Sequence, residues 1–142
     1  MTMTREAARQ YAELGLAPLP LAEESKKPPL LKGWQYADQA ALWRAWEDAP
    51  PSANLGLRCG DAGLAILDCD ELQTWEKVSA HLGGLGLQPG DYPLVASASG
   101  TGRHVYITLS DPPTGHYCKL SLEVGAGEFR FGKGAYCVAP PS

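Results

Sequence analysis

Residues 64–70 constrain the fold most strongly, because they form an apolar run that ends in two aspartates. Side chains alternate between the two faces of a strand, so Asp68 and Asp70 are expected to project from the same face at its end. Two neighbouring carboxylates repel each other, and a bound cation is the usual remedy. The structural alternative is that Asp70 caps a helix that begins with Glu71. Taken alone, the pair leaves both explanations open.

The remaining apolar patterns predict short strands mixed with a few helices. Helical spacing is present in three places, and Asp38 is expected to cap the second helix. The expected helices cover residues 4–14, a segment after Asp38, and residues 72–82. Strands are expected at residues 54–59, 64–70, 94–99, 103–109, 127–131 and 135–139, with a hairpin turn at 60–63. Residues 16–21 contain two prolines and are expected to form at best an edge strand. The sequence therefore predicts a mixed α/β (α+β) domain, with a largely antiparallel sheet and flanking helices.

Composition and charge narrow the class of protein. The chain has 142 residues, of which 44% are hydrophobic and 20% charged, which is typical of one globular domain. No apolar run reaches the roughly 20 residues that span a bilayer, and the N-terminus lacks a signal peptide, so we expect a cytoplasmic protein with no membrane partner. The net charge of −4 argues against a surface that binds nucleic acid over its whole area. It is compatible with an acidic centre that recruits divalent cations.

A histidine at the start of the strand over residues 103–109 is the next candidate. His104 follows the glycine-containing segment 99–102, so it lies at the mouth of a turn. There it can donate to a phosphate oxygen, with help from the turn amides. Ser97 and Ser99 share a face of the preceding strand. A structural histidine at a strand edge is the alternative.

Charged residues on the strand over residues 127–131 are further candidates. Glu128 and Arg130 share one face, so Glu128 is a candidate third carboxylate and Arg130 a candidate partner for phosphate or carboxylate. A solvated sheet face explains the same pattern. Glu123 is a rival for the acidic role. Lys27 lies in a loop where it would contact either a triphosphate or only solvent.

Four cysteines occur singly, with no Cys-x-x-Cys pair. His116 and Cys118 would make half of a zinc site, but the other half is not evident. Buried free thiols are the preferred interpretation.

In their order and spacing, these segments resemble the N-terminal catalytic domain of bifunctional DNA primase–polymerases, which belong to the archaeo-eukaryotic primase superfamily. That family is typical of plasmids, phages and other mobile elements. The resemblance covers nearly the whole chain as a single domain, residues 1–142. It rests on residues 14–20, 26–28, 33–34, 37, 46, 54–57, 60, 63–70, 97–106 and 134–142. Relatives commonly continue into a helical accessory domain or a helicase, so we expect either a truncated or a minimal version.

The resemblance implies a role for each matching residue. Asp68 and Asp70 match the motif whose carboxylates bind two Mg²⁺ or Mn²⁺ ions, and Glu128 matches the third acidic residue, where the family often has Asp. His104 matches the histidine that contacts the nucleotide phosphates. The expected nucleotide-binding residues are Ser97, Ser99, Arg103, His104, Arg130 and Lys27.

The resemblance also implies an activity: metal-dependent nucleotidyl transfer from nucleoside triphosphates (dNTP or NTP) to a 3′-hydroxyl on a single-stranded DNA template or primer. The expected context is replication of a plasmid, phage or other mobile element, with a helicase or accessory domain as a further partner. Two alternatives stay open. One is a catalytically reduced module that only binds nucleotide or single strands, and the other is a metal-dependent nuclease that uses the same carboxylates.

Overall fold

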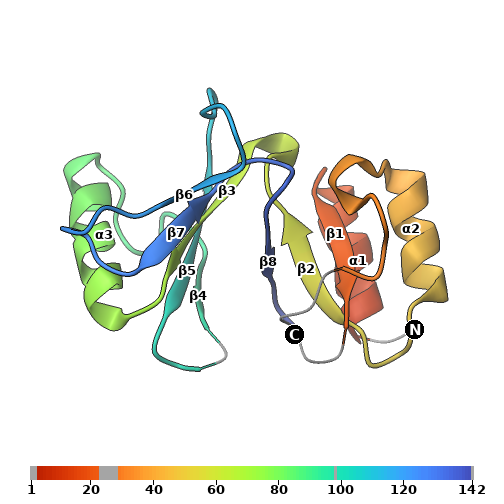
Figure 1. Cartoon of the computed structure of the whole chain (residues 1–142). Helices are drawn as coiled ribbons and strands as arrows, with labels where there is room; N and C mark the ends of the chain where they lie inside the picture. The colour runs from red at the N-terminus through yellow and green to blue at the C-terminus, as the bar shows by residue number, and fades with distance from the viewer. Residues whose placement is uncertain (1–2, 23–28, 98, 142) are drawn as a thin grey trace. The chain divides into compact units, whose positions relative to one another are not determined.

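The computed structural model describes residues 3–22, 29–97 and 99–141 (Figure 1). These residues form three α-helices, two short 3₁₀ helices and eight strands, and the strands build two antiparallel sheets. The mixed α+β class predicted from the sequence is therefore confirmed. The chain divides into two compact units, one of residues 1–62 and 133–142 and the other of residues 63–132.

The first unit has a three-stranded sheet with helices packed on its first strand. The sheet order is β1-β2-β8, and α1 and α2 both contact β1. As predicted, Asp38 caps α2, because its Oδ1 accepts a hydrogen bond of 2.9 Å from the Ala41 amide. Leu19 and Leu42 lie in the buried core of this unit. Its elements are α1 (Met3–Glu13), β1 (Ala17–Leu21), η1 (Trp34–Tyr36), α2 (Gln39–Asp48), β2 (Asn54–Arg58) and β8 (Tyr136–Val138).

The second unit has a five-stranded sheet in the order β4-β5-β3-β7-β6, and all neighbouring strands are antiparallel. The apolar strand β3 is at its centre, as expected for a segment whose residues are nearly all buried. Its elements are β3 (Leu64–Cys69), α3 (Leu72–Gly84), β4 (Leu94–Ala96), β5 (Arg103–Thr108), β6 (Tyr117–Lys119) and β7 (Gly127–Arg130). The 3₁₀ turn η2 (Asp61–Gly63) precedes β3.

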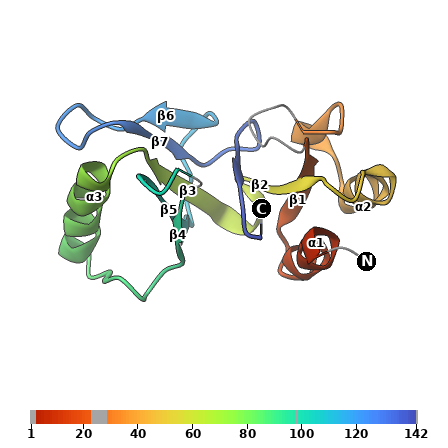
Figure 2. The same ribbon diagram turned by 90° about the horizontal axis from the view of Figure 1, so that it is seen from below.

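The two faces of this five-stranded sheet differ in chemistry. Leu67 and Val105 belong to the same buried core cluster as Val78 and Leu82 of α3. Figure 2 shows α3 lying beside the five-stranded sheet. Asp68 is next to Leu67 in the chain and therefore projects from the other face. The helix thus covers the apolar face and leaves the polar face on the side away from α3.

One expectation about the strands was wrong, and one strand was missed. Residues 60–63 do not close a hairpin, because β2 and β3 belong to different sheets. Gly60, Ala62 and Gly63 all have positive φ, which redirects the chain between the sheets instead of turning it back on itself. The strand β6 was not anticipated, since all three of its residues are exposed and give no apolar alternation.

Candidate active site

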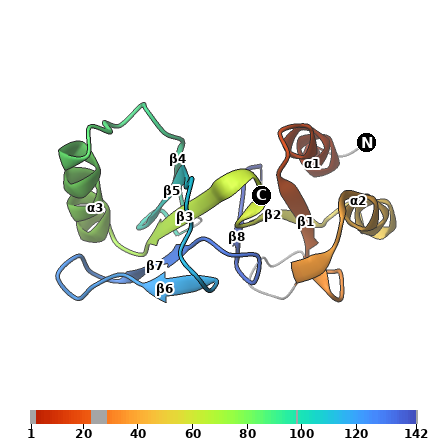
Figure 3. The same ribbon diagram turned by 90° about the horizontal axis from the view of Figure 1, so that it is seen from above.

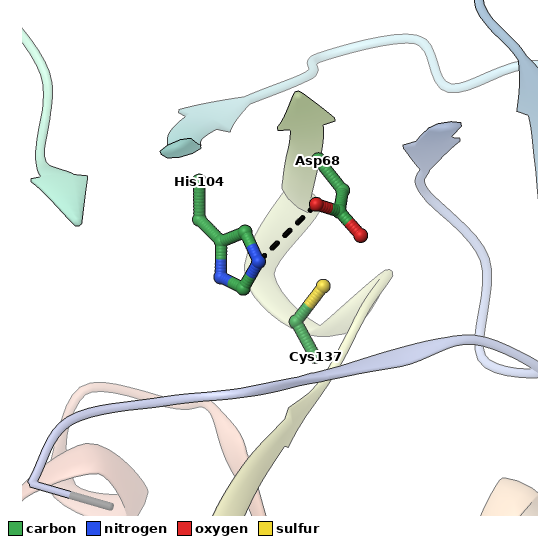
Figure 4. Close-up of side chains that lie close together, drawn as sticks. All are labelled: Asp68, His104 and Cys137. Carbon is green, nitrogen blue, oxygen red and sulfur yellow. Dashed lines mark ion pairs between the residues drawn. The ribbon is translucent and has the colours of Figure 1, made fainter. Parts of the chain in front are cut away.

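The register of the five-stranded sheet brings the predicted residues together. On β3, Asp68 lies directly opposite His104 of β5 on one side and Glu128 of β7 on the other. Directly opposite residues in antiparallel strands have Cβ atoms about 5 Å apart on the same face. The three residues therefore form one row across three adjacent strands, and the close-up shows the His104 ring directed at the Asp68 carboxylate (Figure 4).

Both oxygens of Asp68 have cationic or hydrogen-bonding partners. His104 Nε2 lies 3.3 Å from Oδ1, and Arg130 Nη2 lies 3.1 Å from Oδ2. Arg130 also donates from Nε to Oε2 of Glu128, at 3.2 Å. Arg130 therefore bridges two carboxylates of the row. Arg130, a candidate partner for phosphate or carboxylate in the sequence, contacts two carboxylates here.

The environment shifts the pKa of Asp68 and Asp70 in opposite directions. Burial acts to raise the pKa of Asp68, but the hydrogen bond from His104 and the charges of His104 and Arg130 outweigh it, so the pKa is lowered. This ionised form therefore favours folding at neutral pH, and its contribution is lost as the pH falls through the folded-state pKa. The pKa of Asp70 is raised, first by burial and then by the charges of Asp68 and Glu128.

Asp70 is accessible to solvent. Its carboxylate is on an exposed residue just beyond β3, and its backbone amide donates to the Ala126 carbonyl at 3.1 Å. The residue that caps α3 is Glu71, and it makes no side-chain capping bond. The alternative in which Asp70 serves as a helix cap is therefore wrong.

The turn before His104 carries a chain of hydroxyl groups. Ser99 Oγ lies 3.1 Å from Ser97 Oγ and 2.9 Å from Thr101 Oγ1. Ser97 Oγ also accepts from the Gly102 amide at 3.0 Å. Arg103 turns back, and its Nη1 donates to the Gly102 carbonyl at 2.8 Å. The turn therefore presents hydroxyl groups, with Arg103 bonded to its backbone.

Two glycines allow the strands to approach at the level of the row. A Cβ atom at Gly102 would lie 2.5 Å from the Cys69 carbonyl oxygen, and one at Gly127 would lie 2.2 Å from that of Asp68. Both distances are below any normal contact, so a side chain at either position would force the backbone apart. Gly127 also has a φ of 155°, in the region that favours glycine.

The other predicted residues lie elsewhere. Glu123 is an exposed residue in a turn between β6 and β7, whereas Glu128 lies on the sheet directly opposite Asp68. The geometry therefore favours Glu128 over Glu123 as the third carboxylate. Lys27 lies outside the described residues.

Comparison with protein families decides the relationship. The family model described as bifunctional DNA primase/polymerase, N-terminal, matches residues 8–142. The chain belongs to this primase/polymerase family. The match extends over both compact units and contains every residue of the row. The resemblance noted in the sequence is thereby confirmed.

Membership in the primase/polymerase family implies nucleotidyltransferase chemistry, with nucleotides and DNA as substrates. Members of the family generally depend on metal ions. No curated protein matches the chain. Among the described residues, no helix is long and apolar enough to cross a membrane.

Thiol reactivity offers a test of how this primase/polymerase chain is packed around its row of carboxylates. Burial, followed by the charges of Asp68 and Asp70, raises the pKa of Cys69 to about 11 from 9.0. At pH 8 this lowers its thiolate fraction roughly 100-fold, and burial blocks the reagent as well. We expect iodoacetamide in EDTA-containing buffer to label the exposed Cys118 first and Cys69 at least 100-fold more slowly, as measured by peptide mass spectrometry.

Unfolding in guanidinium is the control for this labelling experiment, since all four cysteines should then react at similar rates. Equal rates for Cys69 and Cys118 in the folded protein would contradict the packing described. As expected, Cys59, Cys69 and Cys137 are buried and form no disulfide, but Cys118 is exposed because β6 lies at the sheet margin.

Proposed function

We propose that this domain carries out metal-dependent nucleotidyl transfer from a nucleoside triphosphate to a 3′-hydroxyl on single-stranded DNA. The observation that carries the proposal is the row in which Asp68 lies between His104 and Glu128, with Asp70 beyond it. That residues 1–142 act as one catalytic domain is part of the proposal, and the single family match across both units supports it. The proposal also includes a role in replication of a plasmid, phage or other mobile element, with a helicase or accessory domain as partner.

The carboxylates fit hard divalent cations. Asp68, Asp70 and Glu128 supply only oxygen donors, which Mg²⁺ and Mn²⁺ prefer. Burial first, and then the charges of Asp68 and Glu128, raise the pKa of Asp70, and a bound cation would relieve the repulsion among these carboxylates. These three residues would hold two ions. When bound, such ions activate the attacking hydroxyl and stabilise charge at the reacting phosphate.

The remaining groups suit the polyphosphate. Among the described residues, His104 Nδ1 is a buried nitrogen with no hydrogen-bond partner, while Nε2 faces Asp68. The hydroxyl groups of Ser97 and Ser99 line the adjacent turn, and they can donate to phosphate oxygens. We propose that His104 orients a phosphate group, because the contact between its Nε2 and Asp68 fixes the position of the ring. Arg103, Arg130 and Lys27 complete the proposed nucleotide-binding set.

Primer synthesis and extension on single-stranded DNA provide the test. The full chain is incubated with labelled template, with and without a primer, with Mn²⁺ or Mg²⁺ and with dNTPs or NTPs. We expect template-dependent products that EDTA abolishes. Shortened template in the absence of nucleotides would indicate a nuclease instead. Nucleotide binding without any product would indicate a module that has lost catalysis, and both outcomes would overturn the proposal.

A further inference from the structure

The five-stranded sheet ends at β6, which lies beside β7 (Figure 3). In the β6–β7 register, Tyr117 lies opposite Arg130 and Lys119 lies opposite Glu128. Directly opposite residues project to the same face of an antiparallel pair. Tyr117 and Lys119 therefore extend the row that contains Asp68, on the face away from α3.

Accessibility increases along this extension. The side chains of Asp68 and Glu128 are 17% and 35% exposed, and both Lys119 and Tyr117 are exposed residues. The Tyr117 residue retains 57% of its full exposure. An aromatic ring and an ammonium group thus lie side by side on a surface that a large ligand can reach.

The charges on this face favour an anionic ligand at its margin. Residues 63–132 contain only four lysines and arginines: Lys77, Arg103, Lys119 and Arg130. Three of them already make hydrogen bonds: Lys77 donates to the Glu123 carbonyl, Arg103 to the backbone of its own turn, and Arg130 to Glu128. Lys119 makes no ion pair with any other described residue, although it lies opposite Glu128. It is therefore the basic group that this face offers to a ligand.

A lysine on an edge strand has a simpler explanation, because it discourages pairing with the edge of another chain. That explanation does not account for Tyr117, whose exposed ring lies two residues away on the same face. An exposed aromatic residue beside a cation is the combination that single-stranded nucleic acid uses, since bases stack on the ring and phosphates contact the cation.

We propose that Tyr117 and Lys119 form a binding site for the single DNA strand next to the reaction centre. Tyr117 stacks on a base, and Lys119 contacts a backbone phosphate. The inference rests on the proposed function for the choice of DNA as ligand, and it adds where that strand lies on the sheet. It also explains how a chain of net charge −4 holds a polyanion, because the contact is local.

The test measures affinity without catalysis. A fluorescein-labelled oligothymidylate of about 16 nucleotides is titrated with the full chain in EDTA, without nucleotides, and followed by anisotropy. We expect Tyr117→Ala to weaken binding roughly 5- to 50-fold and Tyr117→Phe to leave it within about twofold, because the ring is what stacks. We expect Lys119→Ala to weaken binding and to lower the slope of log affinity against log salt by about 0.7.

Two matched variants serve as controls. Cys118→Ser changes the residue between them on β6, whose side chain projects to the opposite face. Lys77→Ala removes one positive charge from α3. Both are expected to bind the oligonucleotide within about twofold of wild type. Far-UV circular dichroism and thermal unfolding verify that each variant is folded, and Lys119→Gln replaces Lys119→Ala should the latter fail.

Several results would overturn the inference. These are no binding by the wild type at low salt, unchanged binding by Tyr117→Ala and Lys119→Ala, or equal losses for Lys119→Ala and Lys77→Ala. An increase in the KM for dNTP with unchanged oligonucleotide affinity would assign these residues to the nucleotide instead. The binding assay contains no metal and no dNTP. A wild type that binds DNA but makes no product would therefore contradict the proposed function and leave this inference standing.

Discussion

Replacing Asp68 and Asp70 together is expected to lower primer extension by on the order of 1,000-fold or more, to below detection in ordinary assays. The two carboxylates supply most of the oxygen donors of the proposed metal site, and no other described carboxylate lies opposite Asp68 except Glu128. The measurement is product formed per minute with Mn²⁺ and dNTPs on primed single-stranded DNA. Asp68→Asn/Asp70→Asn is preferable to the alanine pair, because it keeps the shape of both side chains beside His104.

The matched control for this prediction is Glu76→Ala/Asp111→Ala. It also removes two negative charges, but from exposed positions of the same unit, one on α3 and one in the loop after β5. We expect its activity to stay within about threefold of wild type. If the Asn pair keeps more than about a tenth of wild-type activity while remaining folded, these aspartates do not form the reaction centre.

The second large effect concerns stability and lies in the first unit. Arg58 is only 4% exposed, and its guanidinium makes two bonds to the Asp61 carboxylate, from Nε at 2.8 Å and from Nη2 at 2.9 Å. Its Nη1 donates to the carbonyl oxygens of Trp34 and Ala37, at 2.7 and 3.0 Å. The buried Arg58 side chain thus links η1 to the end of β2 through hydrogen bonds.

We expect Arg58→Met to lower the free energy of unfolding by about 3 to 5 kcal/mol. The methionine fills similar volume but leaves two carbonyl oxygens without their donor, and it leaves Asp61 with only Lys133, whose Nζ lies 4.0 Å from Oδ1. Urea denaturation followed by circular dichroism gives the value. Arg58→Lys should lose less, because it keeps the charge but cannot make the two-pronged contact.

The double variant Arg58→Met/Asp61→Leu separates the origins of this loss. Removing both charges should restore part of the stability, since the largest cost is a buried charge without its partner. A loss below about 1 kcal/mol in Arg58→Met would mean that water replaces the guanidinium at little cost. The described contacts would then be incidental to folding.

The sequence could predict which face each site residue occupies, because the strand period of two is read directly from the chain. Asp68 and His104 were each placed on a polar face in this way. The sequence could not show that β3 lies between β5 and β7, since pairing partners are set by the whole sheet. Only the side-chain contacts show that Arg130 reaches both Asp68 and Glu128.

The missed features share a physical cause. The turn at residues 60–63 resembled a hairpin because its glycines suit many turns, and the positive φ of Ala62 cannot be read from an alanine. Tyr117 escaped notice because a three-residue exposed strand has no buried alternation to detect. Lys119 escaped notice for the same reason.

Arg130 already serves as a counter-ion for Asp68 and Glu128. A divalent ion that enters must compete with a guanidinium already fixed between Asp68 and Glu128. Under the proposed function, a metal ion without nucleotide would therefore bind more weakly here than it would to three carboxylates that had no arginine partner. A triphosphate changes this exchange, because it brings new anionic oxygens to which the displaced guanidinium can turn. Arg130 would then favour the binding of metal and nucleotide together over the binding of metal alone.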